Sequence, residues 1–149
     1  MAGFTLTSSS FAEGGAIPTK QSCDGADLSP ALAWSGAPAG TAAFALIVDD
    51  PDANGFVHWV AYDIPAGTTS LPEGVTATWE PPQGRNDFGN AGWGGPCPPT
   101  GTHHYRFTLY ALSRPLALSG TPSAANVRSA AAAATLARTT LTGVYTRRR

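Results

Sequence analysis

Four stretches of the chain carry apolar residues in the patterns of β-strands. Residues 42–49, AAFALIVD, form a nearly continuous apolar run of strand length, which predicts a central strand covered on both faces. Residues 56–64 resume with aromatic and β-branched side chains, and residues 103–112 alternate between apolar and polar positions. Residues 4–11 predict a further strand near the start. These patterns indicate a protein built mainly from β-strands.

One segment favours a helix. Residues 122–141 are rich in alanine with few helix breakers, and Ser123 is suited to cap the first turn. Gly143 is expected to end this helix. Many Gly/Pro loops separate the strands, so the whole pattern predicts an all-β dominated sandwich with a peripheral C-terminal helix. The 149 residues are expected to form a single domain, residues 1–149.

A rigid loop precedes the alternating strand. Residues 92–101 contain four glycines and three prolines, which exclude regular helix or strand there. The strand that follows is expected to point His103 and Tyr105 to one face and His104 to the other. The Trp93 ring, an imidazole and a row of backbone N–H groups then meet at the start of this strand, although core packing is an alternative for Trp93. This arrangement predicts one wall of a small anion pocket.

Further polar residues stand where the other predicted core strands end. Asp50 and Asp52 follow the strand of residues 42–49, and His58 lies near the start of the next strand. With His103 they suit a phosphate or carboxylate, because imidazoles donate hydrogen bonds and a neighbouring Asp can orient a histidine. Each residue also has a plainer explanation, which is turn formation for the aspartates and packing for the histidines.

Composition and charge argue against some functions. The chain is 42% hydrophobic and 13% charged with a net charge of −1, which disfavours nucleic acid as a partner. No apolar run approaches the roughly 18 residues of a membrane-spanning helix, so no membrane insertion is expected. The start of the chain lacks the basic and apolar regions of a signal peptide, so a cytoplasmic location is expected. In that reducing compartment Cys23 and Cys97 are expected to be thiols, whether or not their loops meet.

Four motifs carry a resemblance to a known family. They are SCDGADLSPALAWSG at residues 22–36, DDPDA at residues 49–53, VHWVAYDIPA at residues 57–66 and GWGGPCPPTGTHHYRFTLYAL at residues 92–112. With these motifs in this order, the chain resembles the phosphatidylethanolamine-binding protein family, and in particular its bacterial branch of Raf kinase inhibitor-like proteins. The resemblance implies an antiparallel β-sandwich of two sheets. It also implies a small surface cavity that binds phosphate, phosphorylated head groups, acetate or cacodylate.

The resemblance further implies which residues line that cavity. They are Asp50, Asp52, His58, Gly95 as a backbone donor, Pro98, Pro99, His103 and Tyr105. Three positions depart from the family pattern. Trp93 replaces a usual tyrosine and keeps an aromatic wall, Asn54 stands where proline is frequent, and His104 stands where arginine is common.

The leading hypothesis for function is a non-enzymatic protein that binds a small anion or phosphorylated ligand, such as a phospholipid head group, a nucleotide or a phosphorylated side chain. By analogy with the family this extends to modulating a kinase. An alternative, also implied by the resemblance, is a protein inhibitor of a hydrolase such as a carboxypeptidase. The bacterial members suggest a homodimer. Neither a cofactor nor a metal is expected.

Two enzymatic alternatives use the same residues. Asp50, His58 and His103 could hold a metal ion as two histidines and a carboxylate. Cys97 could instead act as a nucleophile with His103 as its base. The Ser-rich segments contain no nucleophile-elbow pattern, which disfavours a serine hydrolase.

Overall fold

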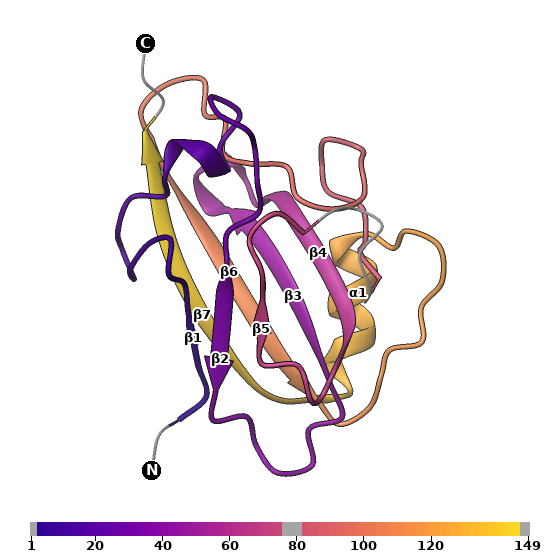
Figure 1. The fold of residues 1–149 in the computed structure, drawn as a ribbon. Helices are drawn as coiled ribbons and strands as arrows, with labels where there is room; N and C mark the ends of the chain where they lie inside the picture. Colours follow the sequence, from indigo (N-terminus) through magenta and orange to yellow (C-terminus); the bar gives the residue numbers. More distant parts are fainter. Residues whose placement is uncertain (1–2, 76–81, 147–149) are drawn as a thin grey trace.

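Two antiparallel β-sheets form the body of the protein in the computed structural model, which describes residues 3–75 and 82–146 (Figure 1). The smaller sheet has the strand order β1-β2-β5, with bounds Thr5–Thr7, Leu32–Ser35 and Ser70–Leu71. The larger sheet has the order β4-β3-β6-β7; in chain order β3, β4, β6 and β7 span Ala43–Asp50, Phe56–Pro65, Thr102–Leu112 and Thr135–Thr146. All pairs of neighbouring strands are antiparallel.

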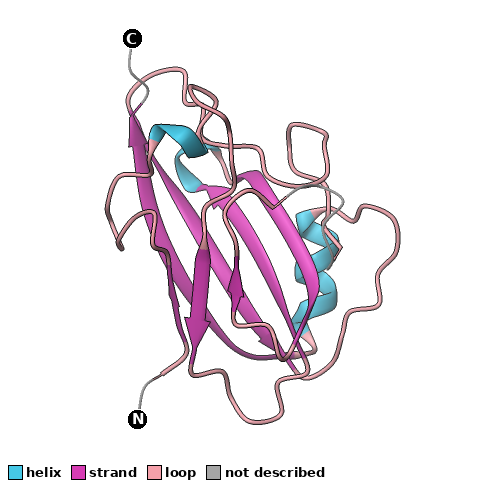
Figure 2. Cartoon of the chain, viewed as in Figure 1, coloured by secondary structure: helices cyan, strands magenta, loops and turns pink. Residues whose placement is uncertain are grey.

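In the described residues, helical structure is confined to short segments (Figure 2). The α-helix α1 spans Ala124–Ala132 and lies against the outer face of the larger sheet, over β3 and β4. Two 3-10 turns, η1 (Thr19–Gln21) and η2 (Pro51–Ala53), lie in the connections. The predicted fold class is confirmed: the chain is mostly β, with two antiparallel sheets and a helix near its C-terminal end.

The strand β3 is covered on both faces, as its continuous apolar run predicts. All eight of its residues are buried. Phe44, Leu46 and Val48 belong to the main core between the two sheets, whereas Ala45 and Ile47 pack in a second cluster together with α1. This strand therefore carries the groups at its end, Asp49 and Asp50, to opposite faces of the sheet.

The predicted helix is wrong beyond its first half. Ser123 does cap α1, and its side chain accepts a hydrogen bond from the Asn126 backbone N–H. Residues 135–141, however, belong to β7, where Thr-rich sequence pairs with β6 along the whole strand. Gly143 does not stop a helix. It lies within β7, where a Cβ atom would stand 2.6 Å from Ile17 Cγ1 and 2.7 Å from Phe11 Cε2.

The predicted first strand, residues 4–11, is shorter in the structure, where β1 covers only Thr5–Thr7. None of the helices in residues 3–75 and 82–146 has the length and apolar character needed to cross a membrane.

Candidate functional site

A hollow of about 220 Å³ opens where β3 ends and β4 and β6 begin, at the upper end of the molecule in Figure 1. The antiparallel pairing brings these strand ends together. The strands contribute Asp50, Phe56, His58, His103 and Tyr105 to its lining, and the connections contribute Ala53, Phe88, Cys97, Pro98 and Pro99. Six of the nine residues predicted for the site thus line one cavity.

Asp50 closes β3 and holds two groups with its two oxygens. Oδ1 accepts the backbone N–H of Asp52 at 2.8 Å and so caps the η2 turn. Oδ2 lies 2.6 Å from Nδ1 of His103. Because a carboxylate oxygen accepts, the His103 ring donates from Nδ1. This bond orients the ring and leaves Nε2 as its other polar atom.

His58 is buried on β4, and a backbone carbonyl in the loop of residues 92–101 fixes the orientation of its ring. Its Nδ1 lies 2.6 Å from the carbonyl oxygen of Gly94, and a carbonyl can only accept, so Nδ1 carries a proton. Burial lowers the pKa of His58 below its ordinary value, and the bond to Gly94 and the charge of Asp50 oppose this shift only in part. At neutral pH the ring is therefore uncharged, and Nε2 is a hydrogen-bond acceptor.

Aromatic rings enclose the histidines. The Tyr105 ring meets His58 edge-on with centroids 5.1 Å apart, and it stacks with His103 at 6.5 Å. Phe56 and Phe88 lie 5.1 and 5.5 Å from the His58 ring. Burial, and secondarily the charges of nearby aspartates, raises the pKa of Tyr105 well above its ordinary value, so its hydroxyl remains a donor. That hydroxyl makes no hydrogen bond within the described part of the chain and is available to a ligand.

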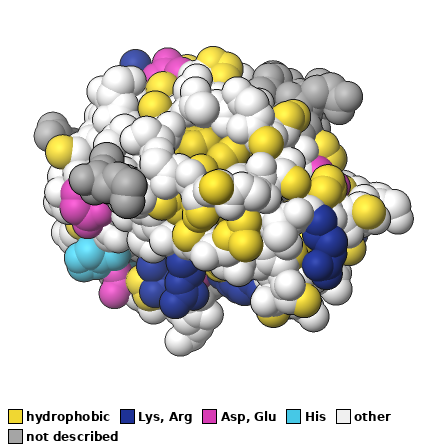
Figure 3. All heavy atoms as spheres, turned by 90° about the horizontal axis from the view of Figure 1, so that it is seen from below, with side chains coloured by type: hydrophobic (Ala, Val, Ile, Leu, Met, Phe, Trp, Pro, Cys, Tyr) yellow, Lys and Arg dark blue, Asp and Glu magenta, His cyan; other side chains and the backbone are white. Residues whose placement is uncertain are grey.

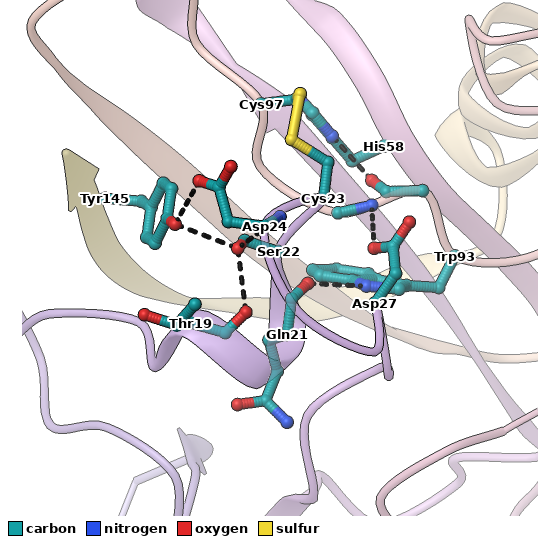
Figure 4. The surroundings of a disulfide bond; sticks show 12 residues. Thr19, Gln21, Ser22, Cys23, Asp24, Asp27, His58, Trp93, Cys97 and Tyr145 are labelled. Carbon is teal, nitrogen blue, oxygen red and sulfur yellow. Dashed lines mark hydrogen bonds between the residues drawn. A yellow bond between two sulfur atoms is a disulfide. The ribbon is translucent and has the colours of Figure 1, made fainter. Parts of the chain in front are cut away.

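A disulfide joins Cys23 and Cys97 and fixes one wall of the hollow (Figure 4). This corrects the expectation of two thiols. The two cysteines are 74 positions apart in sequence, but the fold brings their Cα atoms to 5.5 Å, a separation that suits a disulfide. Beside the bond, the Cys23 N–H donates to the Pro96 carbonyl at 3.1 Å, so two links tie the glycine- and proline-rich loop to the segment around Cys23.

Trp93 packs between the loop of residues 92–101 and the hydrophobic core, and it is not among the residues that line the hollow. Its Nε1 donates to the carbonyl of Gln21 at 3.0 Å (Figure 4). Its ring meets Trp59 edge-on at 5.6 Å and stacks with Phe107 at 6.0 Å. The prediction of an aromatic wall at this position is therefore wrong. The Trp93 ring packs against the hydrophobic core, and Phe56 and Phe88 form the aromatic walls of the hollow instead.

Gly95 and Asp52 also have other roles than the predicted ones. The Gly95 N–H donates to Asp27 Oδ1 at 2.8 Å, so it is not an unused donor for a ligand. Asp52 is exposed and accepts from the His104 backbone N–H at 2.7 Å and from its Nδ1 at 2.8 Å. These bonds, the side-chain one first, lower the pKa of Asp52. They tie η2 to the start of β6, with His104 outside the hollow as expected.

The geometry does not support the two enzymatic alternatives. Cys97 is bonded to Cys23 and offers no thiolate. Across residues 3–75 and 82–146, no three His, Cys, Asp or Glu side chains lie close enough together to hold a metal ion. Asp50 and His103 are instead paired with each other, and His58 is turned to a backbone carbonyl.

Sequence reasoning missed Ala53, Phe56, Phe88 and the structural part played by Cys97. Phe56 was expected only as the start of a strand. Phe88 lies in a loop and keeps 47% of its surface exposed, which is unusual for so large an apolar side chain. An aromatic residue in a polar, glycine-rich loop was the available signal.

Comparison with known proteins finds relatives of this chain. The model of the family described as phosphatidylethanolamine-binding protein matches residues 7–146. A Mycobacterium tuberculosis protein named as lipoprotein LppC is 49% identical over 137 residues, covering 87% of this chain and 65% of that protein. The chain therefore spans just under two thirds of the length of LppC.

Two solved structures share the fold over nearly the whole chain. CT736 of Chlamydia trachomatis, described as a phosphatidylethanolamine-binding protein homologue, has a TM-score of 0.92 at 32% identity and covers 99% of this chain and 100% of its own. YbcL of Escherichia coli, described as a member of the mammalian family of these proteins, has a TM-score of 0.90 at 38% identity with the same coverage. The two-sheet arrangement is thus the fold of these neighbours.

Proposed function

Because the chain belongs to the phosphatidylethanolamine-binding protein family, we propose that it is a non-enzymatic binding protein whose ligand is a small anion or phosphorylated group held in the hollow of Asp50, His58, His103 and Tyr105. One observation carries the proposal. The Nδ1 atoms of both histidines are engaged, one by Asp50 and the other by the Gly94 carbonyl. Each ring therefore keeps Nε2 for a ligand, beside the unused Tyr105 hydroxyl.

The size of the hollow supports a small ligand. At about 220 Å³ it lies below the usual range of roughly 300–1,000 Å³ for drug-sized ligands. It suits a phosphoryl group, an acetate or a short head group, and it is too small for acyl chains. Phe56, Phe88 and Pro98 provide an apolar side, which suits the carbon atoms next to a phosphate ester.

The protonation state of His58 narrows the class of ligand that fits the hollow. A neutral ring with Nδ1 engaged offers an accepting Nε2, whereas Tyr105 offers a donating hydroxyl. A monoprotonated phosphate or phosphate ester satisfies both, because it carries one P–OH donor and several accepting oxygens. The proposal thus favours phosphorylated ligands over simple carboxylates at neutral pH.

The test is a titration followed by histidine side-chain NMR. The purified protein is titrated with inorganic phosphate, phosphoethanolamine and a nucleoside monophosphate. Saturable shifts of His58 and His103, with little change at His104, support the proposal. Replacing His103 by alanine should weaken binding, while His104→Ala on the opposite face of the same strand is the matched control. Unchanged spectra with all three ligands would overturn the proposal.

Protein partners and compartment stay predictions. The family implies a kinase, a hydrolase or a second copy of the chain as partner. Pull-down experiments test the first two, and sedimentation-velocity measurements test self-association. The expected cytoplasmic location has one observation against it, since disulfides such as Cys23–Cys97 persist mainly in oxidising compartments. Alkylation of cells before lysis, followed by mass spectrometry, distinguishes bonded from free cysteines in each fraction.

A further inference from the structure

A second hollow lies on the opposite face of the larger sheet. Its volume is about 570 Å³, and its lining shares no residue with the first hollow. It lies over the outer sides of β6 and β7, beside α1, and three of the chain's nine Lys and Arg residues contribute to it. The lining consists of Asp49, Asn54, Gly55, Arg106, Thr108, Tyr110, Arg128, Arg138 and Thr140.

Asp49 fixes two of the arginines. Its carboxylate accepts from Arg106 Nε and Nη2, each at 3.1 Å, in a two-pronged pair. It also accepts from Arg128 Nη2 at 3.1 Å, across the gap between sheet and helix. The carboxylate is buried, but the arginine side chains are 48% and 42% exposed. Both guanidinium groups are therefore held in place while still facing solvent, so binding an anion costs them little conformational entropy.

Arg138 completes the set, and its side chain has no ion pair or hydrogen bond within residues 3–75 and 82–146. It lies on β7 opposite Tyr110 of β6. With Asp49 as the single acidic residue in the lining, three guanidinium groups leave two positive charges in excess. The ion pairs with Asp49, which link α1 to the sheet, account for the positions of Arg106 and Arg128. They do not account for the exposed Arg138 beside them.

An apolar hollow adjoins the charged one. Its volume is about 440 Å³; it shares Tyr110, Arg128 and Arg138 with its neighbour, and its other lining residues are Ala131, Ala132, Thr135 and Ala137. Charged side chains are few in this protein, and Figure 3 shows basic ones gathered in separate patches, one of them beside exposed hydrophobic side chains. The combined site is thus cationic at one end and apolar at the other.

We propose that these adjoining hollows form a second ligand site, for a phosphate monoester that carries a compact apolar group. The phosphate dianion matches the two excess positive charges, and guanidinium groups bind phosphate oxygens in pairs. The apolar group lies against the alanines of α1 and β7, and Tyr110 lies between the two parts. The site is separate from the hollow of His58 and His103 and requires neither histidine.

The test is an amide NMR titration of the intact protein with phenyl phosphate. Inorganic phosphate and phenol, which each represent one part of that molecule, are titrated separately for comparison. Phenyl phosphate should shift residues 106–110 and 137–140 and bind more tightly there than either half. Arg138→Ala should weaken this binding about tenfold or more, the loss of one charge-assisted contact. Arg114→Ala, an exposed arginine outside both hollows, is the matched control and should change nothing.

A variant of the first hollow separates the two sites. Tyr105→Phe should leave the phenyl phosphate shifts of residues 106–110 and 137–140 intact. Shifts confined to residues 97–105, or an affinity unchanged by Arg138→Ala in a protein with unaltered circular dichroism, would overturn the proposal. Equal affinity for inorganic phosphate and phenyl phosphate would refute the apolar part of it.

Discussion

Asp49 and Asp50 are consecutive residues of β3, and their carboxylates hold basic side chains on opposite faces of the same sheet. Asp50 pairs with His103 at 2.6 Å on the side of the small hollow. Asp49 pairs with Arg106 and Arg128, each at 3.1 Å, on the outer side. Alternation along a strand produces this division without any further device. Both carboxylates are nearly inaccessible to solvent, and each holds its partner side chains in place.

Tyr105→Phe tests the first hollow with the smallest change. The ring remains packed between the histidines, but the hydroxyl that we assign to the ligand is lost. We expect phosphate affinity to fall by about 0.5–1.5 kcal/mol, the usual net value of one hydrogen bond, with the free energy of unfolding nearly unchanged. Isothermal titration calorimetry and urea unfolding measure the two quantities. Tyr62→Phe, whose hydroxyl approaches the Gly120 carbonyl instead, is the control. Equal phosphate affinity in both variants would remove Tyr105 from the site.

His58 makes stability depend on pH in a definite direction. Its pKa is lowered in the folded protein, chiefly by burial, whereas in the unfolded chain it is about 6.5. Below that value the unfolded state binds more protons than the folded state, so acidification favours unfolding. The contribution of His58 to stability is therefore complete above pH of about 6.5 and is lost as the pH falls through its folded pKa.

Urea unfolding at a series of pH values checks this expectation. His58→Asn keeps a donor toward Gly94 but does not titrate. The variant should lose part of the fall in unfolding free energy that the wild-type protein shows on acidification below pH of about 6.5. Parallel pH profiles for the two proteins would mean that the His58 pKa is not lowered by folding.

The strands that carry the hollow were predictable because their signals are local. The apolar run of β3 and the alternation of β6 fix which side chains face inward, and the alternation placed His103 and Tyr105 correctly on their strand. Asp50 was expected just after the strand of residues 42–49 and is instead the last residue of β3. The extent of the helix was not predictable in this way. Alanine-rich sequence continues past Ala132, and the pairing with β6 that turns residues 135–146 into a strand is non-local.

The loop residues were misassigned for the same reason. The partners of Trp93 and Gly95 are Gln21 and Asp27, which lie about 70 positions earlier in the chain. No local pattern shows that an indole N–H or a backbone donor is already engaged by so distant a segment. The Cys23–Cys97 bond is a further contact of this kind, and only the folded arrangement reveals it.

Removal of the disulfide should affect both stability and binding. Cys23 and Cys97 close a loop with a sequence separation of 74, and such a bond stabilises a fold by about 2–5 kcal/mol. The double variant Cys23→Ser with Cys97→Ser is expected to lose this amount and to bind phosphate more weakly, since Cys97 lines the hollow. Guanidinium unfolding with and without dithiothreitol measures the first effect. The reductant should leave the double variant unchanged, and a wild-type protein equally indifferent to it would contradict the expected stabilisation.

Gly143→Ala tests the packing near the C-terminal end of β7. A Cβ atom at this position would lie 2.6 Å from Ile17 Cγ1 and 2.7 Å from Phe11 Cε2, both of which are buried in the core. Such overpacking typically costs about 1–3 kcal/mol, so we expect the free energy of unfolding to fall by that amount. Gly67→Ala is the matched control, because nothing lies within 4 Å of its added Cβ. Urea unfolding of the two variants in parallel measures the difference. If Gly143→Ala were as stable as Gly67→Ala, the N-terminal segment around Ile17 would not be packed against β7 as the structure describes.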